Sequence, residues 1–267
     1  MTKNPTFDFG VNWQNYSETT LDTERFEAAR ASLARLAGEG ALRDRTFLDV
    51  GCGTGLFTLA AMKSGARRSV GIDVNPLCVE VARRNAARFS QTDLAASEEN
   101  RPAFRVVSAL DTSAMDALGT FETVYAWGSL HHTGRMQEAI ENTARCVAPG
   151  GTFVLAIYNR HWSSAAWTVI KRFYNLSPEW LKPVWNAGFG AVIFCAKWIV
   201  TRRNPLKMER GMNFYHDVVD WIGGYPYEYA SAADMTRRVE AMGFKLRRLV
   251  PAGVPTGNNE FVFEKCL

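Results

Sequence analysis

Three glycines at a spacing of two, Gly51, Gly53 and Gly55, follow an apolar run in the stretch FLDVGCGTGL. Asp49 lies two residues before the first of them, and Asp73 ends the next apolar run. Glycines at a strand end let the backbone approach a ligand closely, and a carboxylate at the end of the second strand can bind both hydroxyls of a ribose. The spacing therefore indicates a site for an adenosine-bearing ligand.

Two common nucleotide-binding patterns fit this stretch poorly. The dinucleotide fingerprint G-x-G-x-x-G requires a third glycine where Leu56 stands. A P-loop requires a lysine after its last glycine, and none follows Gly55. The loop is therefore better suited to an adenosine that lacks phosphates.

Histidines and aspartates form a second group of candidate residues. His131 and His132 follow the fourth apolar run, at the edge where open α/β sheets bind ligands, and an imidazole pKa near neutrality suits a general base. In NFYHDVVDWIGGYPYEY, helical spacing puts His216 and Asp220 on one face, with Asp217 beside them. The alternatives are that one histidine of the first pair packs or caps the next helix, and that the second stretch is an amphipathic helix facing solvent.

The elements that would position these residues alternate between strand and helix. Apolar runs predict strands at 46–50, 69–73, 104–107, 123–127 and 152–158. Helical spacing predicts helices at 21–36, 56–64, 76–89, 136–147 and 232–242. Two further strands are predicted at 244–250 and 260–263, where they would close the sheet as a hairpin. This order predicts an α/β fold with a doubly wound, mostly parallel sheet covered by helices on both faces.

The composition changes near residue 160. Residues 160–212 hold nine Lys/Arg against two Asp/Glu, and they contain five of the eight tryptophans. We interpret 160–229 as a helical, basic and aromatic insertion between strands five and six, serving as a lid or as a substrate or oligomer element. The predicted organisation is an N-terminal cap helix region at 1–40, a core formed by 41–159 and 230–267, and this insertion.

The most apolar part of the insertion is VWNAGFGAVIFCAKWIV, residues 184–200. Its 17 residues reach only the lower limit for a membrane-spanning helix, which needs roughly 17 to 25. The favoured interpretation is a helix packed in its own chain or in a homodimer. One face would be formed by Trp185, Phe189, Val192 and Val200. The alternatives are a peripheral contact of 184–203 with anionic lipid, with Arg202 and Arg203 at the headgroups, and a lid over the acceptor.

Length, net charge and cysteine spacing exclude several classes of protein. With 267 residues, 47% of them apolar, the chain can fill a core, and a net charge of +4 is too small to indicate nucleic-acid binding. The five cysteines include no CxxC pair and no histidine at ligand spacing, which argues against a zinc site and against a disulfide framework. The first residues lack the apolar segment of a secretory signal, so the expected location is cytoplasmic.

D-V-G-C-G-T-G followed by G-I-D-V resembles the class I S-adenosylmethionine-dependent methyltransferases, whose fold has seven strands and a terminal reversed hairpin. Four further stretches, FDFGVNWQNY, WGSLHHTG, VAPGGTFVLAIYNRHW and HDVVDWIGGYPYEYA, are similar to a bacterial small-molecule methyltransferase subgroup. The resemblance covers nearly the whole chain. It implies S-adenosylmethionine as cofactor, S-adenosylhomocysteine as product, and methyl transfer to O, N or S of a small-molecule acceptor.

The resemblance also implies roles for individual residues. Asp49 and the glycine loop would line the methionine end of the cofactor, Asp73 would hold the ribose, and Val74 would pack on the adenine. The family often has an acidic residue for the adenine amino group where this chain has Ser108. The implied cofactor-binding residues are Trp13, Asp49, Gly51, Cys52, Gly53, Gly55, Asp73, Val74, Ser108, Ala109, Leu110, Trp127 and Gly128.

Methyl transfer from a sulfonium is an in-line displacement, so the protein must align the acceptor's lone pair and, for a protonated nucleophile, remove a proton. No metal is needed. The base would come from His131, His132, His216, Asp217 or Asp220, and the candidate acceptor-binding residues are Tyr16, Tyr158, Asn159, Tyr225 and Tyr227. Trp13 and Tyr16 would cover the cofactor and exclude water, or would instead staple the first helix to the core.

Two alternatives to methyl transfer onto a soluble small molecule remain. The acceptor could be a lipid or quinone at a membrane surface, or the chain could be a non-catalytic partner protein that binds S-adenosylmethionine. A nucleic-acid base is disfavoured as acceptor, because the fourth strand ends in WGSLHH instead of the NPPY-like turn that holds an exocyclic amine.

Overall fold

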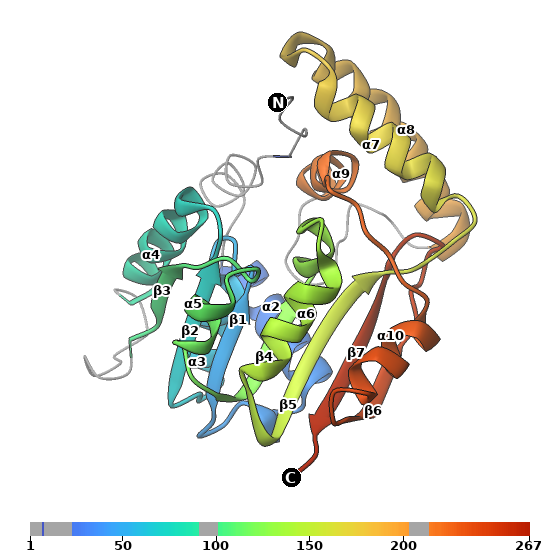
Figure 1. Ribbon diagram of the computed structural model, residues 1–267. Helices are drawn as coiled ribbons and strands as arrows, with labels where there is room; N and C mark the ends of the chain where they lie inside the picture. The colour runs from blue at the N-terminus through green and yellow to red at the C-terminus, as the bar shows by residue number, and fades with distance from the viewer. Residues whose placement is uncertain (1–6, 8–22, 91–100, 203–213) are drawn as a thin grey trace.

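Seven strands form one sheet in the computed structural model, which describes Phe7 and residues 23–90, 101–202 and 214–267 (Figure 1). The strand order is β3-β2-β1-β4-β5-β7-β6. The strands are β1 (Thr46–Val50), β2 (Arg68–Asp73), β3 (Ala103–Val106), β4 (Phe121–Trp127), β5 (Val147–Tyr158), β6 (Phe244–Val250) and β7 (Asn258–Lys265). Only β7 runs antiparallel to its neighbours β5 and β6, and the other pairs are parallel. The predicted mostly parallel sheet with a terminal hairpin is therefore confirmed.

Helices cover both faces of this sheet. The described α-helices are α2 (Thr23–Ala37), α3 (Leu56–Lys63), α4 (Pro76–Ser90), α5 (Thr112–Asp116), α6 (Met136–Arg145), α7 (Ser164–Leu176), α8 (Lys182–Thr201), α9 (Phe214–Gly223) and α10 (Ala232–Glu240). Short 3-10 turns lie at Glu39–Ala41, Leu130–His132 and Glu179–Leu181. The helix α5 was not predicted, because a five-residue helix is too short to show a helical period.

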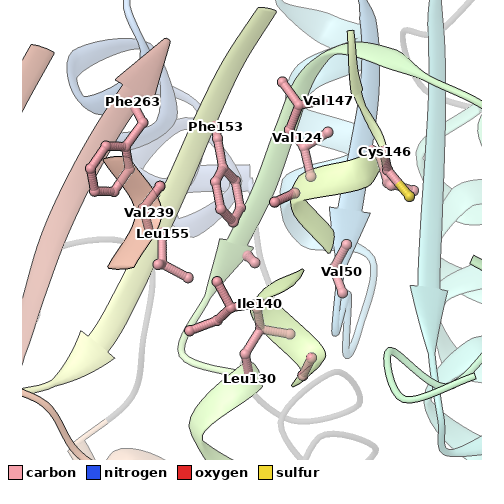
Figure 2. Packing of buried hydrophobic residues seen from close by; sticks show 14 of the residues in the cluster. Val50, Val124, Leu130, Ile140, Cys146, Val147, Phe153, Leu155, Val239 and Phe263 are labelled. Carbon is pink, nitrogen blue, oxygen red and sulfur yellow. The ribbon is translucent and has the colours of Figure 1, made fainter. Parts of the chain in front are cut away.

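The core consists of two layers, one on each side of the sheet. Val124 and Leu155 pack toward α6 and α10 in the cluster that Figure 2 shows, together with Ile140 and Val239. Their strand neighbours Tyr125 and Val154 belong to the opposite cluster, against α2 and α3. Successive side chains of a strand point to opposite faces, so strands buried on both faces are apolar at nearly every position.

The sequence Pro149-Gly150-Gly151 suggests a turn before the fifth strand, but the structure does not end the strand there. It lies inside β5, because Val147 already pairs with Phe121 of β4 before Thr152 resumes the pairing at Thr123. The register shifts between these two pairs, and Gly150 takes a positive φ of 69° there. The turn residues therefore form an irregularity within one long strand.

The insertion leaves the sheet after β5 and returns before α10. Asn159 and Ala230 form a parallel bridge, so the two ends of the insertion lie side by side. Figure 1 shows α7, α8 and α9 beyond the end of β5, at the edge of the sheet where the parallel strands end. The division of the chain into core and insertion at these residues stays a prediction.

Only part of the predicted apolar face of α8 is covered. Trp185 and Phe189 pack against a cluster that includes Tyr174 of α7 and Ile222 of α9, as expected for packing within the chain. Val192 is 61% exposed instead, so it does not pack within its own chain, and its packing in a homodimer stays a prediction. The side chain of Val200 lies outside the described residues. Within the described ranges, no helix is long and apolar enough to cross a membrane.

Candidate functional site

The glycine-rich loop joins β1 to α3, and its backbone conformation requires glycine. Gly51, Gly53 and Gly55 have φ values of 78°, 51° and 75°, in the region that residues with a Cβ rarely adopt. The amides of Gly51 and Cys52 both donate to the carbonyl of Ile72, at 2.8 and 2.9 Å, and this fixes the loop against the end of β2. The loop therefore presents backbone at the carboxyl end of two adjacent strands.

A neighbouring turn approaches this loop at Gly51. A Cβ on Gly51 would lie 2.2 Å from the Cβ of Ser129, which follows β4. The Ser129 hydroxyl donates to the carbonyl of Val50 at 2.7 Å. The glycine loop and the turn that carries His131 and His132 are therefore in direct contact, although 78 residues separate Gly51 from Ser129.

Asp73 ends β2 and organises the loop beside it. Its carboxylate accepts the amide of Gly53 at 3.0 Å through one oxygen and the amide of Asn75 at 2.9 Å through the other. Burial raises the pKa of Asp73, and these backbone hydrogen bonds lower it in part. A carboxylate has about four acceptor positions, so it can still accept hydroxyl groups of a ribose.

Asp49 lies beneath the loop and is 2% exposed. The Thr58 hydroxyl donates to its carboxylate at 2.8 Å. Burial raises the pKa of Asp49 to about 7, the Thr58 hydrogen bond offsets part of this, and the nearby charge of Asp73 raises it further. A cationic ligand group beside Asp49 would favour the charged carboxylate and lower this pKa again.

The raised pKa of Asp49 predicts a specific pH dependence of stability. The folded-state pKa of about 7 exceeds the reference value of 3.8, so proton binding by Asp49 stabilises the cofactor-free fold at acid pH. This contribution is lost as pH rises from about 4 to 7, at ~1.4 kcal/mol for each pH unit. In urea unfolding from pH 4.5 to 8.5, wild type should lose stability relative to Asp49→Asn by ~3 kcal/mol, nearly all of it between pH 4.5 and 7.

The control for this comparison is Asp116→Asn, which removes an exposed carboxylate that pairs with Arg145 at 3.0 Å. Its unfolding free energy should follow that of wild type across the pH range within about 0.5 kcal/mol, as for most surface substitutions. Parallel pH profiles for wild type and Asp49→Asn would show that the Asp49 carboxyl is already charged in the folded chain.

The predicted adenine-side residues lie next to Asp73 in the fold. Val74 is a large apolar side chain that is 67% exposed, and it follows the half-buried Asp73. Ser108 accepts the Leu110 amide through its hydroxyl at 3.2 Å, and the Ala109 carbonyl accepts from the Asn142 side chain. Ala109 and Leu110 are also partly buried against the core. Their roles as cofactor contacts stay predictions.

Trp127 ends β4 and Gly128 follows it, on the other side of the loop. The Trp127 indole donates to the Glu260 carboxylate at 2.6 Å, so its ring is held by β7. Gly128 has a φ of 77° and nothing within 4 Å of the position that a Cβ would occupy. This backbone is open to a ligand, as its predicted role requires.

His131 and His132 occupy different environments. His131 is fully buried, its ring centroid lies 4.0 Å from that of Tyr158, and its ring nitrogens have no partner with good hydrogen-bond geometry among the described residues. His132 is half-buried, and its Nδ1 lies 2.8 Å from the Pro226 carbonyl. A carbonyl only accepts, so Nδ1 carries the proton and Nε2 is the acceptor nitrogen.

The near-neutral pKa expected for these histidines is wrong. Burial lowers the pKa of His131 well below 6.5, and the neighbouring His132 and Lys171 lower it further. Burial and then the charge of Lys171 lower the pKa of His132 to about 3. Both rings are therefore neutral at physiological pH. Neither is the cap of α6, because the Met136 amide donates to the Glu228 carboxylate at 3.0 Å.

A buried lysine completes this cluster. Lys171 of α7 is 0% exposed, and its Nζ lies 5.6, 4.9 and 4.8 Å from the ring centroids of Tyr158, Trp221 and Tyr227. Cations over aromatic faces are stabilised by the ring quadrupole. Lys171 was not predicted as a site residue. Its one sequence signal is a cation three residues before Tyr174, at helical spacing on the packed face of α7.

The structure brings together some predicted acceptor-binding residues and separates another. Tyr158 and Tyr227 are buried with ring centroids 5.0 Å apart, beside the two histidines. Burial raises the pKa of Tyr227 to about 12, so its phenol stays protonated.

The Asn159 side chain donates to the Pro255 carbonyl and accepts from Asn259, which ties it to the β7 side of the fold. Tyr225 is half-buried, and its carbonyl accepts the Phe7 amide.

Several predicted site residues cannot be placed. Trp13 and Tyr16 lie outside the described residues, as do the side chains of His216, Asp217 and Asp220, although α9 itself is described. Within the described part of the chain, no group of three or more His, Cys, Asp or Glu side chains is arranged to hold a metal ion.

Comparison with known proteins decides the family. The family described as a methyltransferase domain matches residues 21–249, which is most of the chain. The chain belongs to this family of class I S-adenosylmethionine-dependent methyltransferases. The methyltransferase also shares its fold with the magnesium protoporphyrin IX methyltransferase from Synechocystis PCC 6803 with bound SAH. That likeness has a TM-score of 0.56 at 16% identity and covers 96% of this chain and 93% of the other.

Curated relatives match over shorter stretches. A ribosomal protein L11 methyltransferase from Xanthomonas campestris is 33% identical over 139 residues, covering 49% of this chain and 45% of the relative. One from Tolumonas auensis is 44% identical over 52 residues, covering 20% of this chain and 18% of the relative. The methyltransferase thus spans less than half the length of these relatives.

The described residues fit S-adenosylmethionine. The glycine loop lacks the Cβ atoms that would fill it, the Asp73 carboxylate keeps acceptor capacity, and the exposed Val74 offers an apolar surface beside it. Gly128 leaves open backbone on the opposite side. Apolar contact for the adenine, acceptors for the ribose and close backbone for the methionine end are the groups that this cofactor requires.

Proposed function

We propose that this methyltransferase transfers a methyl group from S-adenosylmethionine to an O, N or S atom of a small-molecule acceptor. The observation that carries the proposal is the contact between the glycine loop and the turn after β4. Gly51 of the loop contacts Ser129 of this turn. The same turn carries His131 and His132, whose rings lie beside Tyr158 and Tyr227. The acceptor would bind at this cluster, beside the methionine end of the cofactor.

In this proposal the cofactor lies along the carboxyl ends of β1, β2 and β4. Asp73 binds the ribose hydroxyls, Val74 contacts the adenine, and the backbone of Gly51, Gly53 and Gly128 borders the methionine group. When bound, S-adenosylmethionine supplies an electrophilic methyl group on a sulfonium. Asp49 becomes charged beside this cationic ligand, so binding releases a proton to solvent at pH values below about 7.

His132 is the residue placed to orient the acceptor. Its Nδ1–H donates to the Pro226 carbonyl at 2.8 Å, so Nε2 is the nitrogen of the neutral ring that can accept a proton or a hydrogen bond. Its low pKa keeps it neutral, so it acts through alignment of the acceptor and not through a stable imidazolium. The aromatic rings of Tyr158 and Tyr227 exclude water from the same region.

The test is methyl transfer measured in single turnovers with candidate acceptors. With the correct acceptor, His132→Ala should slow the chemical step by at least ~10-fold, and by ~10²- to 10⁴-fold if His132 also takes the proton. Cofactor affinity should remain within about twofold of wild type, because the Asp73 region is unchanged. The wild-type rate should show no titration near pH 6.5 from this residue, since its pKa is about 3.

Two matched variants complete this experiment. His131→Ala should mainly lower stability, because its ring is fully buried against Tyr158. His216→Ala tests the α9 residues His216, Asp217 and Asp220 as an alternative base. An unchanged chemical step in both His132→Ala and His216→Ala would mean that proximity alone suffices and that neither residue is the base.

The acceptor panel must include a protein. The curated relatives are named as methyltransferases of a ribosomal protein, and this observation favours a protein acceptor as the second candidate. Methylation of ribosomal protein and of no small molecule would replace the first proposal. A lipid or quinone acceptor is tested by the same panel with lipid extracts. Cofactor binding without turnover on any acceptor would favour a non-catalytic partner protein.

A further inference from the structure

The outer face of α8 is apolar although it faces solvent. Val184, Val192 and Ile199 are 64%, 61% and 69% exposed, at intervals of eight and seven residues along one side of the helix. The other exposed side chains described between 183 and 199 are Trp198 and small Ala, Gly, Pro and Cys residues, without a charge. A surface helix normally places polar residues outward. The adjoining side of α8 is already packed, through Trp185, Phe189 and Ile193.

Exposed apolar side chains also lie on α7. Val169, Phe173 and Leu176 recur at helical spacing and are 54%, 60% and 59% exposed. The two helices are joined by a contact between the Trp167 and Phe189 rings, with centroids 5.8 Å apart. Of the fourteen exposed large apolar side chains in the described chain, nine lie between Trp162 and Ile199. We call the outer side chains of α7, α8 and the Trp180 turn between them the hairpin face.

Solvent exposure on this scale is costly. Each large apolar side chain left in water forgoes the stabilisation that burial would give. An apolar groove of about 420 Å³ on α8, lined by Val184, Gly188 and Val192 among others, adds to the surface. Contiguous exposed apolar surface marks a site of interaction with a protein or a membrane.

The charge of the segment distinguishes between these occupants. Residues 160–212 carry nine Lys/Arg and two Asp/Glu, and Arg172 and Arg202 are exposed at the hairpin face and at the end of α8. A second copy of the chain docked face to face would bring two such basic segments together, which like-charge repulsion opposes. An anionic lipid surface attracts them. Three exposed tryptophans, Trp162, Trp180 and Trp198, suit the boundary between headgroups and acyl chains.

We propose that the hairpin face docks on the surface of a bilayer that contains anionic lipid. α7 and α8 lie in the plane of the interface, with Val184, Val192 and Phe173 among the acyl chains and Arg172 and Arg202 at the headgroups. The contact is peripheral, because no helix in the described ranges can cross a membrane. Figure 1 shows the hairpin on the side of the sheet where the parallel strands end, so docking brings the acceptor side toward the bilayer.

The test is cosedimentation of the full chain with unilamellar vesicles, and it does not depend on methyl transfer. Wild type is expected to pellet with vesicles of equal phosphatidylcholine and phosphatidylglycerol. Binding to phosphatidylcholine alone should be at least ~10-fold weaker, as should binding to the mixed vesicles in 0.5 M salt, because charge attraction is lost. The double variant Val184→Glu with Val192→Glu should weaken binding to mixed vesicles by at least ~10-fold.

The matched control is Leu249→Glu on β6, an exposed apolar position away from the hairpin face, which should bind like wild type. Thermal unfolding of both variants confirms that they fold, since every substituted side chain is exposed. Wild type that stays in the supernatant with mixed vesicles would overturn the proposal. So would undiminished binding by the double variant. A wild-type dimer that light scattering shows to dissociate in the double variant would instead make the face an interface between copies.

Discussion

Asp73→Ala is expected to weaken S-adenosylmethionine binding by at least ~1.5 kcal/mol, more than ~10-fold, because hydrogen bonds to a charged group are worth ~1.5 to 3 kcal/mol. The substitution removes the acceptor for the ribose hydroxyls in the proposed site. It also removes the partner of the Gly53 and Asn75 amides, which hold the loop in shape. Titration calorimetry of wild type and variant measures the affinity directly.

Two comparisons separate ribose binding from loop support. Asp73→Asn keeps the shape but offers one acceptor and one donor to two backbone amides, so it should be intermediate in affinity. Asp116→Ala removes an exposed carboxylate on α5 and should bind the cofactor like wild type. Unchanged affinity in Asp73→Ala would contradict the cofactor site proposed at the end of β2, and binding of NAD by wild type would contradict the choice of cofactor.

Gly51→Ala is expected to lower the free energy of unfolding by ~2 to 5 kcal/mol and to abolish measurable cofactor binding. The positive φ of 78° costs a residue with a Cβ roughly 1 to 2 kcal/mol. The new Cβ would also lie 2.2 Å from that of Ser129, so the β4 turn must move away from the loop. Overpacking of this kind costs ~1 to 3 kcal/mol more. Urea unfolding and calorimetry measure the two effects.

The chain offers a matched control for the backbone part of this effect. Gly119 has a similar φ of 76° and nothing within 4 Å of the position that a Cβ would take, so Gly119→Ala should lose only the backbone contribution of ~1 to 2 kcal/mol. In Gly51→Ala, the second substitution Ser129→Gly removes the overlapping Cβ and should restore ~1 to 3 kcal/mol. Equal losses of unfolding free energy in Gly51→Ala and Gly119→Ala, without rescue by Ser129→Gly, would contradict this prediction. They would show that a Cβ at position 51 does not clash with Ser129.

Local patterns in the sequence were sufficient to predict most strands of the sheet. The bounds predicted for β1 and β6 agree with the structure, and those of the other strands differ by one to several residues. Buried strands carry apolar side chains on both faces, so each is visible as a run without knowledge of its neighbours. β5 shows where this fails, because the Pro149–Gly151 turn signal is local and the pairing of Val147 with Phe121 is not.

The candidate cofactor site was equally visible in sequence, since its signals are also local. The positive φ values of Gly51, Gly53 and Gly55 explain why glycine stands at each of these positions. The acceptor side gave weaker signals. Lys171 was missed because its role depends on rings of Tyr158, Trp221 and Tyr227, which come from three other parts of the chain.

The sequence by itself determined the order of apolar runs along the chain, the glycine loop with Asp49 and Asp73, and the basic, aromatic character of the insertion, because these depend on residue type and short spacing. Only the tertiary structure decided the protonation of His131 and His132, since burial and Lys171 set their pKa values. It also decided which side of α8 is covered. Helical spacing predicts on which side of α8 an apolar residue such as Val192 lies. Whether another element covers that side depends on packing between segments distant in the chain.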